Sequence, residues 1–182
     1  MKLILVGQGK TQWDEESRLQ GTIDLPLSPR GRKQVSSLAR KLHALRPKGI
    51  VSGTGETLSE TSRILARRLR CRVYAYEQLN ELNHGLWEGM LHREIEERHP
   101  QVYRRWCANP QSVSPPKGES IAELLERVGE VLERLRRRHS DTIVMVLPEM
   151  VRLAAQALLT GLTVETLWSR RPTRVEWTGL DI

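Results

Sequence analysis

Four features that mark other classes of protein are missing from this 182-residue sequence. No apolar run approaches the ~20 residues of a membrane-spanning helix, and the apolar stretch at residues 3–6 is too short for a signal-peptide core, so we expect a cytoplasmic protein. The two cysteines, Cys71 and Cys107, lack metal-ligand spacing, which predicts buried or inert thiols. No linker divides the chain, because the helix after the proline-containing segment 109–118 needs the same core. We predict a single domain over residues 1–182.

The loop after the first predicted strand lacks a nucleophile. Residues 3–6 (Leu-Ile-Leu-Val) are typical of a buried strand, and residues 7–13 (Gly-Gln-Gly-Lys-Thr-Gln-Trp) leave its carboxyl end, where open α/β sheets bind ligands. The centre of this loop offers glycines, an amide and Lys10, but no His, Cys, Ser or carboxylate. A P-loop is also excluded, because that motif needs a glycine where Ile4 stands.

Acidic residues are too few to balance the basic ones. The formal net charge is +7 and the pI is about 9.9, mainly because arginine clusters at residues 67–72, 136–138 and 170–171. Such a surface favours an anionic partner. Two of these clusters end predicted helices, where cations offset the helix dipole, so a basic nucleic-acid-binding module is an alternative that rests on charge alone.

Hydrophobic patterning, which is present throughout, predicts an α/β fold. The predicted strands are residues 3–6, 50–52 and 142–147, with an outer strand at 73–76 and an edge strand at 173–178. The predicted helices are residues 29–46, a second helix that follows the turn at 53–55 and reaches Arg70, residues 91–107 with a break at Pro100, then 120–138 and 151–159. This order predicts a three-layer α/β/α domain with a mostly parallel central sheet.

Several short motifs, in order along the chain, carry a family resemblance. They are residues 6–14 (Val-Gly-Gln-Gly-Lys-Thr-Gln-Trp-Asp), 18–21 (Arg-Leu-Gln-Gly), the turn and helix start at 24–34, residues 79–81 with 85–89, and 117–120 (Lys-Gly-Glu-Ser). By these motifs the chain resembles the histidine phosphatase superfamily, also called phosphoglycerate mutase-like. The resemblance implies that family's three-layer fold.

The resemblance also implies a chemistry that requires a nucleophilic histidine, a second histidine, two phosphate-binding arginines and an acidic proton donor. Carried over by position, the nucleophile falls at Gln8 and the second histidine at Pro148, neither of which can act as a histidine does. The proton donor survives as Glu81. The implied phosphate pocket is formed by four positions, two of which would carry the arginines: Gly7, Gly9, Thr11 and Thr57.

We expect no other residue to rebuild this site. His84 is close to Glu81 in sequence, but a lone loop histidine is usually structural, and Gly85 prevents Glu81, His84 and Glu88 from forming one metal-binding face. The other histidines are assigned to surface faces of helices, and they are His43, His92, His99 and His139. The nearby cations are Lys10, at a position where the family varies, and Arg152, which begins a helix that faces the sheet.

We therefore predict a pseudoenzyme that needs no cofactor or metal and binds an unknown protein or small-molecule partner. One alternative is an active phosphatase or mutase on phosphorylated metabolites, which the family frame, Glu81 and Trp13 favour. The other is the nucleic-acid-binding module, which salt-dependent binding to unrelated duplexes would distinguish.

Overall fold

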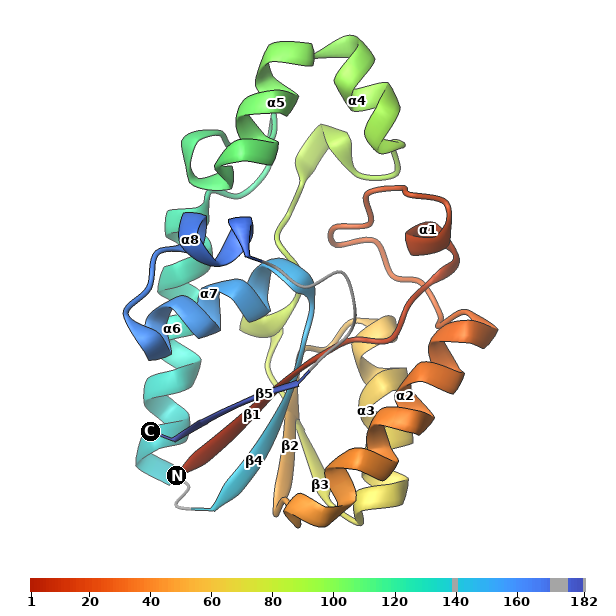
Figure 1. The fold of residues 1–182 in the computed structure, drawn as a ribbon, viewed down its shortest axis with the longest axis vertical. Helices are drawn as coiled ribbons and strands as arrows, with labels where there is room; N and C mark the ends of the chain where they lie inside the picture. The colour runs from red at the N-terminus through yellow and green to blue at the C-terminus, as the bar shows by residue number, and fades with distance from the viewer. Residues whose placement is uncertain (139–140, 171–176, 182) are drawn as a thin grey trace.

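A five-stranded sheet forms the centre of the protein, in a computed structural model that describes residues 1–138, 141–170 and 177–181. The strand order is β3-β2-β4-β1-β5 (Figure 1). Four strands are parallel, and β5 runs antiparallel to β1. Their bounds are β1 Lys2–Gly7, β2 Gly49–Ser52, β3 Arg72–Ala75, β4 Thr142–Leu147 and β5 Trp177–Asp181. The predicted fold class is confirmed, and Gly7 pairs with Leu147 where the two central strands end.

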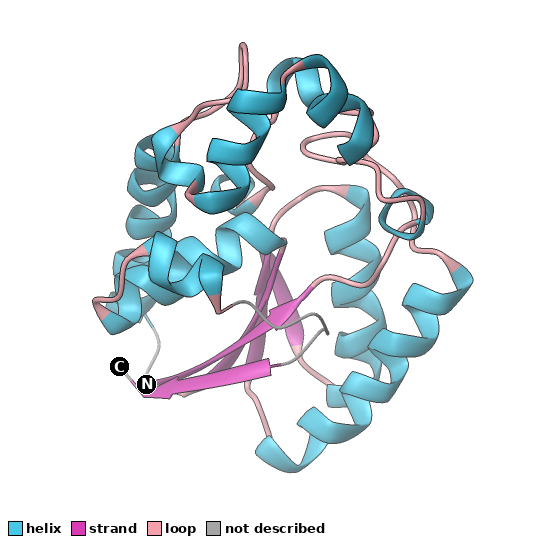
Figure 2. Ribbon diagram, turned by 45° about the horizontal axis from the view of Figure 1, so that its top comes forward, coloured by secondary structure: helices cyan, strands magenta, loops and turns pink. Residues whose placement is uncertain are grey.

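Helices cover both faces of this sheet (Figure 2). The helices α2 (Pro29–Leu42) and α3 (Glu56–Leu69) pack on one face, and α6 (Ile121–Arg138) and α7 (Glu149–Thr160) pack on the other. Alternate side chains of β1 point to the two faces of the sheet. Ile4 and Val6 pack in the core beneath α2 and α3, and Leu3 and Leu5 pack in the core beneath α6 and α7. A strand buried on both faces reads as an unbroken apolar run, which is why residues 3–6 could be recognised.

Four short helices surround the carboxyl ends of the strands. They are α1 (Gln12–Glu15), α4 (His92–Arg98), α5 (Pro100–Ala108) and α8 (Val164–Ser169), and single turns occur at η1 (His43–Leu45), η2 (Glu77–Leu79), η3 (Gly85–Trp87) and η4 (Pro110–Ser112). Figure 1 places α4 and α5 beyond the strand ends. The indole of Trp168 in α8 donates to the carbonyl of Cys107 in α5 at 2.7 Å, which ties these two helices together. Among the described residues, no helix is long and apolar enough to cross a membrane.

The local signals for helix ends are confirmed. The Ser28 hydroxyl accepts from the Gly31 amide at 3.0 Å ahead of α2, and the helical region after residue 91 breaks at Pro100. The predicted edge strand is present but begins at Trp177, and residues 173–176 lie outside the described residues. The helices α1 and α8 were not predicted, because four and six residues are too few to show a helical period.

Candidate active site

An open cavity of about 750 Å³ lies where β1 and β4 end. Its walls come from the loop after β1, the start of α7, the segment after η2, and the helices α4, α5 and α8. Its polar and charged lining includes Gln8, Lys10, Asp14, Arg18, Gln20, Glu81, His84, His92, Tyr103, Glu149 and Arg152. The cavity lies at the end of the sheet where the sequence analysis expects ligands to bind.

The loop after β1 is held by backbone bonds and close packing. The Gln8 amide donates to the Leu147 carbonyl at 3.1 Å, and the Gly9 amide donates to the Thr61 hydroxyl at 3.0 Å. A Cβ atom at Gly9 would lie 2.7 Å from a methyl group of Val35, so glycine lets the loop approach α2. Gly7, Gln8 and Gly9 all line the cavity, as their positions in the motif predict.

Thr11, Thr57 and Pro148 are not part of the main cavity lining. The Thr11 hydroxyl caps α1 and donates to the Asp14 carboxylate at 2.9 Å. The Thr57 hydroxyl donates to the Leu25 carbonyl at 2.6 Å and accepts from Gln20 at 3.0 Å. Thr57 lines a smaller neighbouring cavity of about 150 Å³, which shares Gln8 and Glu81 with the first. Pro148 stands just before the first turn of α7.

Glu81 is held against the first turn of α7. Its carboxylate accepts from the Leu82 amide at 2.8 Å and from the Met150 amide at 3.4 Å. Burial, with a smaller contribution from the nearby charge of Glu149, raises the pKa of Glu81 to about 7. A substantial fraction of Glu81 therefore keeps its proton at neutral pH, which a proton donor requires.

Within the described part of the chain, three cationic side chains line the cavity: Lys10, Arg18 and Arg152. The position of Arg152 differs from the expectation, which assigned it to the start of a helix that faces the sheet. It lies one turn into α7, and the start of that helix forms part of the cavity wall. Burial lowers the pKa of Arg152, opposed by the charges of Glu149 and Glu81, and a guanidinium stays charged at neutral pH.

The histidines divide between the surface and the cavity. His43 and His99 are exposed as predicted, and His139 lies outside the described residues. For His92 the prediction of a surface position is wrong. The helix α4 packs with α5 and brings the His92 ring to the cavity, where its Nδ1 atom lies 3.0 Å from the Tyr103 hydroxyl. His84 is buried edge-on against Trp106 at 5.8 Å between ring centroids. Burial, with a smaller contribution from His92, lowers the pKa of His84 to about 4, so its ring is neutral at physiological pH.

The cysteines are less buried than expected. Cys71 is partly buried, and Cys107 is exposed and lines the cavity. Among the described residues, no group of three or more His, Cys, Asp or Glu side chains could hold a metal ion.

The whole sequence fits one family. The histidine phosphatase superfamily (branch 1) matches residues 3–182, and the chain belongs to this superfamily. Phosphoserine phosphatase 1 of Hydrogenobacter thermophilus is 34% identical over 170 residues, which cover 93% of this chain and 81% of that protein. Adenosylcobalamin/alpha-ribazole phosphatase of Escherichia coli is 28% identical over 183 residues, which cover 100% of this chain and 90% of that protein.

Solved structures of phosphatases are also similar to this chain over nearly its full length. A mycobacterial glucosyl-3-phosphoglycerate phosphatase in complex with VO3 has a TM-score of 0.91 at 26% identity, covering 99% of this chain and 92% of its own. The alpha-ribazole phosphatase from Shigella flexneri has a TM-score of 0.87 at 27% identity, covering 100% of this chain and 91% of its own.

These relatives contradict the predicted pseudoenzyme that only binds a partner. The relatives are phosphatases whose sequences or structures match nearly the full length of this chain. They favour the alternative of an active phosphatase or mutase on phosphorylated metabolites. The prediction equated the absence of a histidine at Gln8 with the absence of a reaction. Phosphoryl transfer depends mainly on positioning and on charge around the phosphate oxygens, and some enzymes use water as the nucleophile.

Proposed function

We propose that this protein is a phosphomonoesterase that hydrolyses a small phosphorylated metabolite with water as the attacking group. The observation that carries the proposal is the Glu81 carboxyl, held against α7 in the cavity with a pKa of about 7. A cavity of about 750 Å³ has room for a small metabolite. The relatives that hydrolyse phosphate esters support the same class of reaction.

The phosphate group is proposed to bind beside Lys10 and Arg152. Both side chains line the cavity, and their positive charge would offset the charge on the phosphate oxygens. The anionic partner that the basic composition predicts is then the substrate itself. Gln8 also lines the cavity, and its side-chain amide offers an acceptor for the attacking water and donors for a phosphate oxygen.

The proposed reaction balances without a covalent intermediate. Water attacks phosphorus in line with the ester oxygen, and the bond between phosphorus and that oxygen breaks as the new bond to the water oxygen forms. Glu81 transfers its proton to the departing oxygen, which leaves as an alcohol. The water loses one proton to solvent, its remaining O–H stays on the product phosphate, and Glu81 regains a proton from solvent.

Hydrolysis is favoured over mutase activity within this proposal. A mutase of this family would have to store the phosphoryl group on the protein, and the Gln8 amide cannot accept it. We further propose a cytoplasmic location, which the two free cysteines, Cys71 and Cys107, support.

A panel of phosphomonoesters tests the proposal. Phosphate release from p-nitrophenyl phosphate, phosphoserine and 3-phosphoglycerate is measured for the wild type and for Glu81→Gln. We expect release that follows the purified protein and falls about 10²-fold or more in the variant, because the general acid is lost. We also expect no isomerisation of 3-phosphoglycerate. Release that is equal in the two proteins would indicate a contaminant, and no release from any ester would contradict the proposal.

A further inference from the structure

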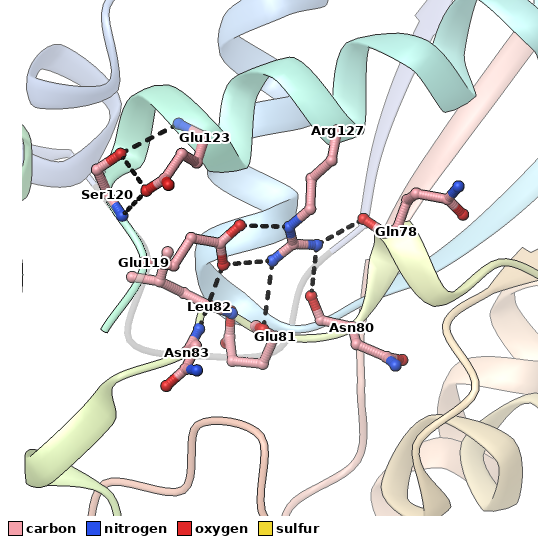
Figure 3. Close-up of polar contacts among 9 residues, drawn as sticks. All are labelled: Gln78, Asn80, Glu81, Leu82, Asn83, Glu119, Ser120, Glu123 and Arg127. Atoms are coloured by element: carbon pink, nitrogen blue, oxygen red, sulfur yellow. Dashed lines mark hydrogen bonds and ion pairs between the residues drawn. The ribbon is translucent and has the colours of Figure 1, made fainter. Parts of the chain in front are cut away.

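The guanidinium group of Arg127 in α6 binds three backbone carbonyls of the segment that carries Glu81 and the carboxylate of Glu119 (Figure 3). Its Nη1 atom donates to the Gln78 carbonyl at 2.5 Å and to the Asn80 carbonyl at 2.8 Å. Its Nη2 atom donates to the Glu81 carbonyl at 3.3 Å. Its Nε and Nη2 atoms also donate to the Glu119 carboxylate at 2.5 Å and 2.8 Å. These bonds use all five N–H donors of an arginine.

Glu119 extends this anchor to the far side of Glu81. Its carboxylate also accepts from the Asn83 amide at 3.3 Å, and its backbone amide donates to the Asn83 carbonyl at 2.8 Å. The Arg127 and Glu119 side chains are only 21% and 16% exposed, so water competes little for these bonds. Together the two residues hold the backbone before, at and after Glu81.

The anchored segment has no regular secondary structure of its own. Residues 80–84 lie between η2 and η3 and belong to no helix or strand. The Glu81 side chain must nevertheless stay against the Met150 amide in the first turn of α7, on a different element. The planar guanidinium group of Arg127 can hold an irregular backbone in place, because each of its hydrogen bonds restricts a different carbonyl.

We propose that Arg127 is a positioning residue for the reaction, holding the Glu81 backbone so that its carboxyl stays in place for proton transfer. This inference rests on the proposed function. A group that must meet the departing oxygen at hydrogen-bond distance tolerates little displacement, and a shift of about 1 Å can cost on the order of 10²-fold in rate. Arg127 itself acts on the peptide backbone and not on the substrate.

The test separates the geometry of Arg127 from its charge. The charged groups that act on Glu81 are Glu149 and Arg152 from α7 and Arg127 from α6. Arg127→Lys keeps the positive charge but replaces a planar fork of five donors with a single ammonium group. We expect kcat to fall about 10- to 100-fold while KM changes less than about twofold, since the phosphate group is proposed to bind beside Lys10 and Arg152, which lie on other elements.

A matched control is Arg32→Lys. Arg32 forms an ion pair with Glu60 at 2.5 Å, and Glu60 accepts from the Leu27 amide, so this pair also ties a loop to a helix. It is not part of the cavity lining. We expect kcat and KM in this variant to match the wild type.

A second measurement does not need turnover. The carboxyl carbon of Glu81, labelled with ¹³C, is titrated by NMR in the wild type, Arg127→Lys and Arg32→Lys. We expect its pKa to move from about 7 toward its ordinary value of 4.5 only in Arg127→Lys, as the loosened carboxyl becomes hydrated. If the wild type proves inactive, the proposed function fails while this titration still decides the positioning role.

The proposal is overturned if Arg127→Lys lowers the melting temperature but leaves kcat and the Glu81 titration as in the wild type. Should that variant not fold, Glu119→Gln takes its place, because it weakens the Asn83 anchor and leaves the three carbonyl bonds of Arg127. We then expect kcat to fall about 3-fold or more at unchanged KM. A normal kcat and a normal Glu81 titration in that variant would likewise overturn the proposal.

Discussion

Replacing Glu81 by glutamine should make the protein more stable at neutral pH and alter how stability depends on pH. In the folded protein, burial raises the pKa of Glu81 from 4.5 to about 7. Between these two pH values the unfolded chain has lost the proton and the folded protein has kept it, so the free energy of unfolding falls as the pH rises. At roughly 1.4 kcal/mol per pH unit, the loss is about 3 kcal/mol by pH 8.

The assay compares two proteins because the wild-type curve contains a second, opposite contribution. The pKa of His84 is lowered from 6.5 to about 4, which makes stability rise with pH over nearly the same window. Urea denaturation of the wild type and Glu81→Gln at pH values from 4.5 to 8.5 cancels this contribution. We expect the variant to gain about 3 kcal/mol relative to the wild type across that range. A difference that does not change with pH would refute the reasoning.

Three further predictions follow from single contacts. His84→Asn should gain stability relative to the wild type as the pH falls from 6.5 toward 4, since a neutral amide takes up no proton and the destabilising contribution of His84 is lost; urea denaturation of both proteins at pH 5 and 7 tests this, and a difference between them that does not change with pH would contradict it. Gly31→Ala should destabilise by about 1–3 kcal/mol although alanine favours helices, because its Cβ would lie 2.1 Å from the Lys10 carbonyl oxygen; a melting temperature equal to or above that of the wild type would count against this. Arg152→Met should weaken vanadate binding about tenfold or more in calorimetry, as expected for a lost charge-assisted bond of about 1.5–3 kcal/mol, and equal affinities would remove Arg152 from the phosphate site.

The sheet and the position of the cavity could be predicted because their signals are local. The apolar runs of β1 and β4 identify two central strands, and a ligand site at their carboxyl ends follows from the architecture. Glu81 could be singled out as a candidate proton donor only because residues 79–81 and 85–89 resemble a motif of the superfamily. The break at Pro100 was equally visible, since proline cannot continue a helix in that position.

The parts that could not be predicted depend on how distant segments pack. His92 has the sequence context of a surface helix, and only the packing of α4 with α5 brings it to the cavity. Arg127 belongs to the polar side of an amphipathic helix, and nothing in the pattern of α6 says which loop that side meets. The replacements at Gln8 and Pro148 were plain in the sequence, but the inference from a missing nucleophile to a missing reaction is contradicted by the phosphatase relatives, and it left out water as an attacking group.

The central claim is tested most directly by the rate of phosphomonoester hydrolysis from pH 5 to 9 in the wild type and Glu81→Gln. If Glu81 is the proton donor, the wild-type kcat should be highest on the acid side and fall above pH of about 7, as the carboxyl loses its proton. The variant should be slower by about 10²-fold or more and lack this decline. A wild type that hydrolyses no ester at any pH, or a variant with the same rate and the same pH profile, would contradict the account.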